Sequence, residues 1–277
     1  MRRAARAAIS FPLLALLFAG AVAAAEKGPV SRATDMNVRD ITAALFKAKP
    51  GEAVDLSKRN LAYLDLAGLN FKGAKLRDAD LYGVDFTGAN LRGTDLSESR
   101  LDRSVLIRAD LSGANLAGAT ILRPTVYSDL TNNPADAPRF SGANMTGARV
   151  HANMSGADFH GADLTGANFV PLDARKREGI ISALADNQLK GCDFSRAILR
   201  GANMGGADLT FARFTGADMT NVNLAGAKLA RADLSNADLT GADLTGADLD
   251  GATLIGVKGL DSVKGLATAL NFDKTIR

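Results

Sequence analysis

Large apolar residues recur at every fifth position over two long stretches of the chain. The first stretch has fifteen such positions, from Leu56 to Val126, and the second has fourteen, from Leu189 to Leu254. A small residue, usually alanine, stands two positions before each of them, so the unit reads A-D/N-L-x-G. A repeat of this regularity constrains the architecture more than any other feature of the chain.

A period of five residues fits neither regular secondary structure. On an α-helix, an apolar stripe with this period would spiral around the axis and bury nothing. On a flat strand, successive apolar residues would point to opposite faces. The pattern is satisfied if each unit forms one short straight segment and then a corner, with the large residue and the preceding alanine pointing inward. Glycine before many of the alanines suits such a corner.

The unit Ala232-Asp233-Leu234 and its many copies resemble the pentapeptide repeat family, over roughly residues 52 to 256. The resemblance implies an all-β solenoid, a right-handed quadrilateral parallel β-helix with four repeats per coil and about nine coils. It implies no shared catalytic residues. Some cytosolic members of the family resemble DNA in charge and shape and bind type II topoisomerases.

The charge pattern independently favours a coil of twenty residues. Only four positions directly before an apolar centre carry a base in the two long stretches. Twenty residues away on either side, seven of their eight neighbours are acidic, whereas a spacing of fifteen gives two and a spacing of ten gives five. Opposite charges on neighbouring strands stabilise a sheet and like charges destabilise it. The four bases are Lys75, Arg100, Arg213 and Lys228.

The N-terminus has the pattern of a secretory signal peptide. Arg2, Arg3 and Arg6 precede an apolar stretch over residues 9–22, and three alanines end it at Ala25. We expect cleavage after Ala25, no transmembrane segment in the mature chain, and a periplasmic or secreted location. An uncleaved membrane anchor is the alternative.

Removing residues 1–25 changes the charge balance. The whole chain has 33 basic and 30 acidic residues, and the leader contains three arginines and no acid, which leaves 30 of each. A neutral mature chain lacks the positive charge that supports binding to nucleic acid. Nucleic acid is therefore not expected as a partner.

Both ends of the solenoid are predicted to be covered, because an open coil presents unpaired strand edges. Residues 26–51 are expected to form a linker and a capping helix, ended by Pro50-Gly51. Residues 257–277 are expected to form a second cap. The apolar face of the first helix would comprise Val38, Ile41, Leu45 and Phe46. A second helix, beginning near Asp261, would place Val263, Leu266 and Leu270 on one face.

Two insertions interrupt the repeat, at residues 127–139 and 170–188. The first contains Asn133-Pro134 and Pro138 and is predicted to be an irregular loop. The second is predicted to be a helix that packs Ile180, Ile181 and Leu184 on the coil. A middle block lies between them, in which the repeat slips by one residue. Its apolar centres are Phe140, Met145, Val150, Met154, Phe159, Leu164 and Phe169.

No group of residues indicates catalysis. Cys192 occupies an inward, alanine-type position and is expected to be a small buried hydrophobic residue. His151 and His160 each follow an inward centre, so both are expected to be exposed, without the convergent ligands of a metal site. We expect neither enzyme activity nor a cofactor.

Two surfaces are candidates for interaction. One is an acidic girdle between residues 232 and 257, a docking surface for a basic partner or a weak Ca²⁺ site, unless it is only a solvated face. The other is the pair of insertions, including the basic run of the second. The candidate residues are Asp233, Asp238, Asp243, Asp248, Asp250, Arg175, Lys176 and Arg177.

These features predict an exported, non-catalytic scaffold that presents a rigid surface to a protein or cell-envelope component. The alternative is a topoisomerase-binding DNA mimic like some members of the family that the chain resembles. That function needs a cytosolic location and regular, strongly acidic faces. An end-to-end homodimer is a further arrangement that the sequence leaves open.

Overall fold

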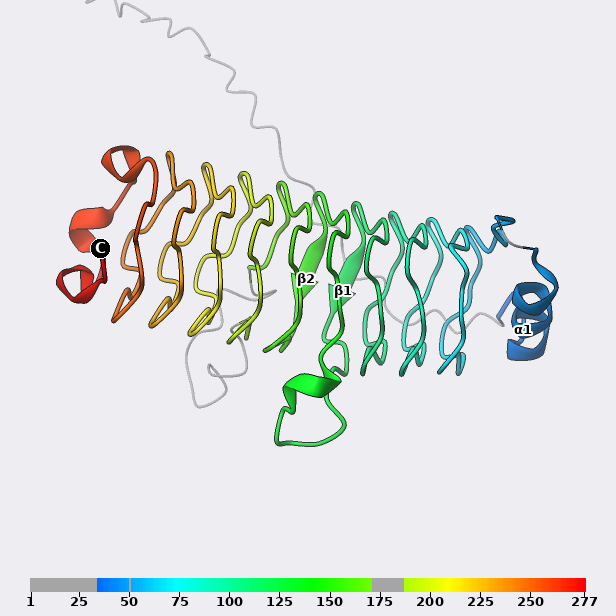
Figure 1. The fold of residues 1–277 in the computed structure, drawn as a ribbon. Helices are drawn as coiled ribbons and strands as arrows, with labels where there is room; N and C mark the ends of the chain where they lie inside the picture. The colour runs from blue at the N-terminus through cyan, green and yellow to red at the C-terminus, as the bar shows by residue number, and fades with distance from the viewer. Residues whose placement is uncertain (1–33, 50, 171–186) are drawn as a thin grey trace, which may run out of the picture. The chain divides into compact units, whose positions relative to one another are not determined.

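The computed structural model describes residues 34–49, 51–170 and 187–277, which belong to one compact unit, Ala33–Arg277. Within this unit the chain winds through stacked coils of four short sides each (Figure 1). The apolar centres of the three repeat blocks number fifteen, seven and fourteen, and all of them are buried. The five-residue pattern therefore places one side chain per repeat in a continuous core.

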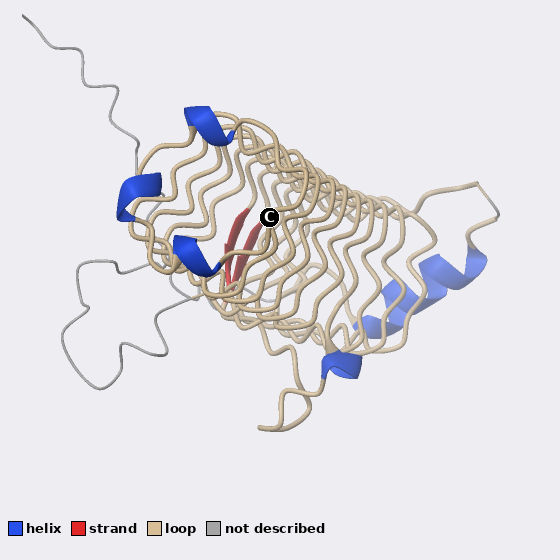
Figure 2. Ribbon diagram, turned by 60° about the vertical axis from the view of Figure 1, so that its left-hand side comes forward, coloured by secondary structure: helices blue, strands red, loops and turns tan. Residues whose placement is uncertain are grey.

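Neighbouring coils pair in parallel through residues that are twenty apart in the regular blocks. Lys75 lies between Asp55 and Asp95, as the charge pattern predicts. The turned view of Figure 2 shows how closely the coils follow one another. The other three bases pair in the same way: Arg100 with Asp80 and Thr120, Arg213 with Asp193 and Asp233, and Lys228 with Asp208 and Asp248.

Each side of a coil is short because a β-turn follows most of the apolar centres. In one example, the Ala89 N–H donates to the Phe86 carbonyl at 2.9 Å, and Gly88 has φ of 62°. A turn of this kind needs a left-handed residue, which glycine supplies without steric cost. The carboxylate of Asp85 accepts the Thr87 N–H at 2.8 Å and braces the same corner. The aspartates and asparagines of the repeat thus have a structural role.

A helix lies at the N-terminal end of the stack, α1 (Val38–Lys47). Its first turn is capped by the Asn37 side chain. Ile41 and Leu45 are buried and belong to the core. Phe46, which the sequence assigns to the same face, is 86% exposed, so that assignment is wrong. One residue after Leu45, Phe46 is turned by about 100° around the helix axis.

The C-terminal segment contains three 3-10 helices: η3 (Leu260–Ser262), η4 (Leu266–Thr268) and η5 (Phe272–Lys274). The predicted helix with Val263, Leu266 and Leu270 on one face is therefore wrong. The three turns stand six residues apart, and the residues between them pair with the preceding coil, as Lys264 does with Asp243. The segment is thus a further coil with wider corners.

The first insertion is shorter than predicted at its C-terminal end. Asp110 pairs with Arg139, twenty-nine residues later, so Arg139 already belongs to the next coil. The loop contains one turn of 3-10 helix, η1 (Pro134–Asp136). Strand β1 (Thr120–Leu122), before the loop, pairs in parallel with β2 (Arg149–His151), after it.

The slip in the middle block occurs directly after β2. Arg139 pairs with Asp158, and Arg149 with Asn168, both nineteen residues apart. The buried centres Val150 and Met154 are four positions apart instead of five, so this coil lacks one corner residue. The chain stays extended through His151 and forms a strand there.

The second insertion also ends earlier than predicted. Asn153 pairs with Gln188, thirty-five residues later, so Gln188 lies in a coil. The predicted helix with Ile180, Ile181 and Leu184 falls outside the described residues, as do the predicted signal peptide 1–25 and the first part of the linker.

A column of phenylalanines holds the coils in register across this second insertion. Phe140, Phe159, Phe194 and Phe214 stack face to face, with centroid separations of 5.0, 4.8 and 5.0 Å. Phe159 and Phe194 are thirty-five residues apart in the sequence but occupy neighbouring coils. Among the described residues, no helix is long and apolar enough to cross a membrane.

Candidate interaction surfaces

The acidic girdle encircles the stack and does not form one face. Its four repeat aspartates are five residues apart and therefore occupy the four successive sides of a coil. Each of them pairs with a coil that contributes a base at the same position. The pairs are Asp233 with Arg213, Asp238 with Lys258, Asp243 with Lys264, and Asp248 with Lys228.

The girdle carboxylates are also engaged locally. Asp238 accepts the Thr240 N–H at 3.0 Å and the Thr240 hydroxyl at 2.6 Å, and these hydrogen bonds lower the pKa of Asp238. Asp250, at a corner, forms an ion pair with Lys274 at 3.4 Å. Among the described residues, no three His, Cys, Asp or Glu side chains converge to hold a metal ion. The girdle thus has the geometry of turn-bracing residues.

Cys192 and the two histidines, the other candidates that the structure describes, form no site. Cys192 is fully buried, its Sγ lies 3.1 Å from the Met154 carbonyl oxygen, and burial raises the pKa of the thiol to about 12. His160 is exposed, as predicted, but the same prediction is wrong for His151, which is half-buried because the chain stays extended in β2 there. The basic run Arg175, Lys176 and Arg177 lies outside the described residues.

The 127–139 loop is firmly attached where it leaves and rejoins the stack. Asp136, buried at the end of η1, accepts hydrogen bonds from the backbone N–H of Ser128 at 3.0 Å and from the Ser128 hydroxyl. These bonds lower the pKa of Asp136. The Arg108 N–H donates to the Asp136 carbonyl at 2.7 Å, and the Arg108 side chain forms an ion pair with its carboxylate at 3.8 Å. One acidic residue thus joins both ends of the loop to the preceding coil.

Two further contacts fix the loop on its other side. The Tyr127 hydroxyl donates to the Ser155 carbonyl at 2.5 Å. Pro134 packs on Gly156, where an added Cβ would lie only 3.0 Å from the Cβ of Pro134. Leu130, in contrast, is 99% exposed at the far side of the loop. The loop protrudes from the stack below β1 (Figure 1).

Sequence reasoning identified this loop as an interruption but missed the residues that shape it. Asn133 accepts the Ala135 N–H at 3.0 Å and begins η1, with Pro134 in the first turn. The Asn-Pro pair is a helix-start signal that could have predicted this turn.

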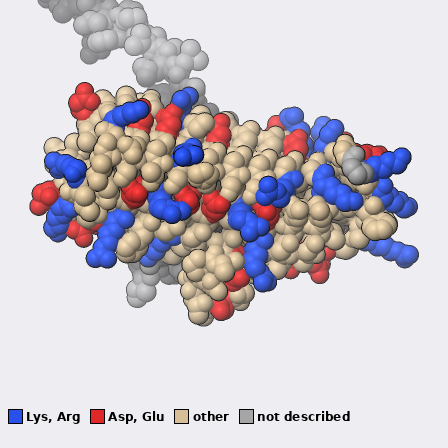
Figure 3. All heavy atoms as spheres, viewed as in Figure 1, with Lys and Arg blue, Asp and Glu red and all other residues tan. Residues whose placement is uncertain are grey.

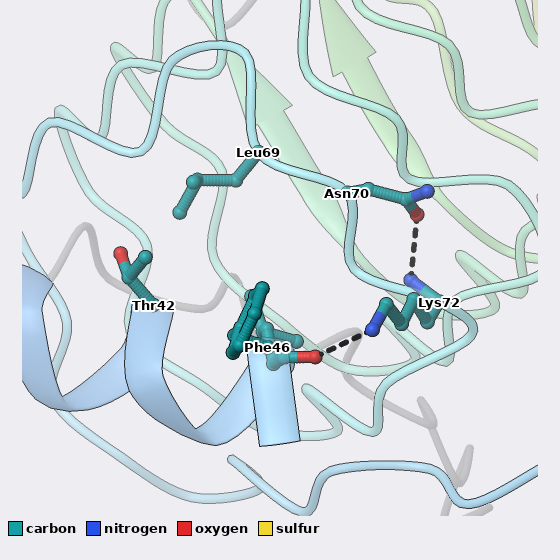
Figure 4. Close-up of a pocket in the computed structure, with 6 residues that line it drawn as sticks. Thr42, Phe46, Leu69, Asn70 and Lys72 are labelled. Atoms are coloured by element: carbon teal, nitrogen blue, oxygen red, sulfur yellow. Dashed lines mark hydrogen bonds between the residues drawn. The ribbon is translucent and has the colours of Figure 1, made fainter. Parts of the chain in front are cut away.

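A small groove lies where α1 meets the first coils (Figure 4). The Lys72 ammonium donates to the Leu45 carbonyl at 2.8 Å and thereby interacts favourably with the negative end of the helix dipole. Phe46 and Leu69 provide the apolar walls of the groove. Nothing in the described structure indicates what would fill it.

The family model for pentapeptide repeats matches the chain in eight copies. The matched residues are 52–88, 85–121, 139–170, 188–226 and 217–256. These ranges include nearly all of the three repeat blocks and leave out most of both insertions. No curated protein shows significant similarity to the chain.

Solved structures of other pentapeptide repeat proteins resemble the chain. HetL from the cyanobacterium Nostoc sp. strain PCC 7120, involved in heterocyst differentiation regulation, is 26% identical; the match covers 87% of this chain and 94% of HetL, with a TM-score of 0.43. QnrB1, a plasmid-mediated fluoroquinolone resistance protein, is 18% identical over 77% of this chain and 95% of QnrB1, with a TM-score of 0.35. A pentapeptide repeat protein of the Arabidopsis thaliana thylakoid lumen is 27% identical over 58% of this chain and 68% of its own, with a TM-score of 0.13.

The family model covers more than half of the chain, and its repeat matches the buried pattern of the coils. The chain therefore belongs to the pentapeptide repeat family, whose fold is a right-handed quadrilateral β-helix.

Proposed function

We propose that this protein is an exported, non-catalytic scaffold that holds the 127–139 loop out as a docking element for a protein or cell-envelope partner. The observation that carries the proposal is the contrast between a firmly attached loop and its fully exposed Leu130. Export is inferred from the predicted signal peptide over residues 1–25. Membership of a family of generally non-catalytic structural and binding proteins supports the scaffold role.

The attachment of the loop favours binding over a merely tolerated insertion. A loop that is already ordered loses little conformational entropy when a partner binds it. The Asp136 contacts and the Tyr127 hydrogen bond impose this order before binding. Near the exposed end, Asp129 accepts the Thr131 N–H at 2.8 Å and the Thr131 hydroxyl at 2.6 Å. Hydrogen bonds between Asp129 and Thr131, the two neighbours of Leu130, therefore fix the backbone around it.

Leu130 gives the loop an apolar contact of useful size. Burying a leucine side chain contributes roughly 1.5–3 kcal/mol. At 99% exposure, Leu130 gains none of this within the described structure. A partner with an apolar pocket would supply that free energy, and the polar residues Asp129 and Thr131 would lie at the rim of the contact.

The test uses the full chain with a C-terminal tag, expressed in its native host and recovered from separated cell fractions. Leu130→Ser removes the apolar contact. Ile255→Ser is the matched control, because Ile255 is another exposed aliphatic residue, 50% exposed, far along the stack from the loop. We expect a partner that co-purifies with the wild type and with Ile255→Ser but is lost with Leu130→Ser.

Two results would contradict the proposal, each in a different part. Equal retention of the partner by all three proteins would exclude the loop as the docking element. Recovery of the protein from the cytosol with residues 1–25 still attached would exclude export. The second result would restore the topoisomerase-binding DNA mimic as the better hypothesis.

A further inference from the structure

One corner of the stack carries large side chains where left-handed backbone favours glycine. It follows the buried centres at positions 61, 81, 101 and 121, and its left-handed residues are Tyr63, Gly83, Arg103 and Arg123, with φ between 54° and 67°. Backbone hydrogen bonds join these turns from coil to coil. The Gly83 N–H donates to the backbone carbonyl of Asp102, and the Arg103 N–H donates to that of Leu122 at 2.8 Å. We call this column the Tyr–Arg corner.

The backbone does not require these side chains. The corner after the centres at 71, 91 and 111 holds Gly73, Gly93 and Gly113 in the equivalent left-handed positions. Residues other than glycine are disfavoured in this conformation because their Cβ crowds the backbone. Arg103 and Arg123 thus occupy positions where glycine would cause less backbone strain.

The two arginines are unpaired within the part of the chain that the structure describes. Both are exposed, and neither forms an ion pair or a side-chain hydrogen bond with a described residue. They lie on adjacent coils, about 4.8 Å apart along the stack. Like charges at this separation repel each other. Neither the backbone nor the charge arrangement explains them.

The acidic residue directly before Arg103 in the sequence, Asp102, is already engaged. One oxygen of Asp102 lies 3.1 Å from Nε of Arg100, and the other accepts the Leu122 N–H at 3.1 Å. Arg100 is also held by the Tyr82 ring, 4.3 Å from the ring centroid, and by Asp80. In the view of Figure 3, basic and acidic side chains are interspersed along the stack.

An exposed aromatic residue extends the same corner. Tyr63 is 65% exposed and meets Tyr82 edge to face, with centroids 5.4 Å apart. Its ring lies over Gly83, where an added Cβ would come within 2.8 Å of it. This contact and the Tyr82 contact fix the ring. The corner therefore presents an oriented aromatic ring beside two available guanidinium groups.

We propose that the Tyr–Arg corner binds an acidic segment of a partner protein. Tyrosine and arginine are the residue types that contribute most at protein interfaces. A guanidinium group binds a carboxylate through two parallel hydrogen bonds. Two adjacent arginines suit a segment with at least two neighbouring Asp or Glu residues, and Tyr63 suits an apolar or aromatic residue beside them. The proposal goes beyond the docking loop, because it concerns a different corner of the stack.

The test measures binding of fluorescein-labelled oligo-glutamate to the full chain at low salt. The variant carries Arg103→Gly and Arg123→Gly, which keep the left-handed backbone. The matched control carries Arg196→Gly and Arg231→Gly. These two arginines are also exposed and have positive φ, and their substitution removes the same amount of charge. Oligothymidylate and polygalacturonate serve as phosphate-bearing and glycan probes.

We expect the wild type and the control to bind oligo-glutamate. The Arg103/Arg123 variant should bind it with an affinity at least about tenfold lower. The melting temperature of that variant should be unchanged or higher, because glycine relieves both the backbone strain and the repulsion.

Three results would overturn the proposal. One is equal binding by the wild type and the Arg103/Arg123 variant. Another is a clear preference for oligothymidylate or polygalacturonate over oligo-glutamate. The last is a marked fall in the melting temperature of the arginine variant, which would assign Arg103 and Arg123 a structural role. None of these outcomes depends on Leu130, so the docking-loop proposal is tested separately.

Discussion

At the scale of single residues, each position of the repeat has one physical role. The apolar centre fills the core, the alanine two before it fits the remaining space, the aspartate or asparagine braces the next corner, and glycine supplies positive φ. These roles could be read from the sequence because every copy repeats them. Phe46 and Asn187 could not, since neither belongs to an unbroken run of the pattern.

Replacing one centre should disrupt the stack. Leu234 is fully buried, and Leu234→Asp would place a carboxylate in the core without a partner. We expect the C-terminal block to unfold, with a loss of roughly 3–5 kcal/mol or more. Circular dichroism melting measures this loss, with the exposed substitution Asn236→Asp as control. An unchanged melting curve for Leu234→Asp would contradict the inward assignment.

Asn187 takes an alanine-type position and closes the second insertion. Its side chain accepts the Ala152 N–H at 2.6 Å and donates to the carbonyls of Val150, at 3.0 Å, and Phe169. Asn187→Ala would leave these buried groups unpaired, at a cost of roughly 2–4 kcal/mol. Chemical denaturation should show this loss, whereas Asn223→Ala, which removes hydrogen bonds to Asn203 and Ala225 at a partly buried position, should cost less. Equal effects would argue against the closing role of Asn187.

At the scale of elements, the sequence predicted the straight repeats better than their interruptions and ends. The last coil was not predicted, because the search for a five-residue period does not detect a six-residue period. Val257-Lys258-Gly259-Leu260 recurs six residues later as Val263-Lys264-Gly265-Leu266. Each of these glycines has positive φ, and an added Cβ would come within 2.3 Å of a threonine in the coil below. A search for a changed period would have found this coil.

The acidic girdle shows the opposite case, because its geometry follows from the predicted coil. With four repeats per coil, aspartates five residues apart must lie on successive sides. The sequence therefore already implied that Asp233 and Asp238 could not share a face. The contacts of the docking loop, in contrast, depend on which corner the loop crosses, and the repeat does not determine that.

The return of the docking loop should be sensitive to acid. Burial would raise the pKa of Asp110, but hydrogen bonds from Ser112 and the Arg139 ion pair at 2.9 Å lower it to about 2. Its ordinary value is 3.8. A lowered pKa in the folded state stabilises the fold above the unfolded value, and this stabilisation is lost as the pH falls from about 4 toward 2.

Asp110→Asn should therefore be less stable than the wild type at pH 7 but should approach it as the pH falls through this window. Urea denaturation at a series of pH values measures the difference. Arg139→Gln should show the same trend with a smaller amplitude, because the Ser112 hydrogen bonds to Asp110 remain. A stability difference that stays constant from pH 7 to pH 2 would contradict the assignment.

At the scale of the whole stack, stability comes from contacts between neighbouring coils. A solenoid gains its core only by stacking, so one disrupted coil exposes the next. The phenylalanine column couples the middle and C-terminal blocks across the second insertion. Such a stack can hold a loop or a corner in a fixed place without a separate domain.

Cys192 provides a probe of this coupling. Its thiol is buried beside Met154, and burial raises its pKa to about 12, so the reactive thiolate is scarce in the folded protein. We expect iodoacetamide to label native protein very slowly at pH 8 and unfolded protein quickly. Leu234→Asp should speed the labelling if disruption spreads toward the middle of the stack. Rapid labelling of the native wild type would contradict the packing around Cys192.

The most direct test of the docking role is photo-crosslinking in living cells with a photoreactive side chain at position 130. The substitution should not affect folding, because Leu130 is 99% exposed. The account predicts one dominant cross-linked partner in the envelope fraction, absent when the same group replaces Asn236 at an exposed corner. Equal or absent cross-linking at both positions would contradict the claim that the β-helix presents this loop to a partner.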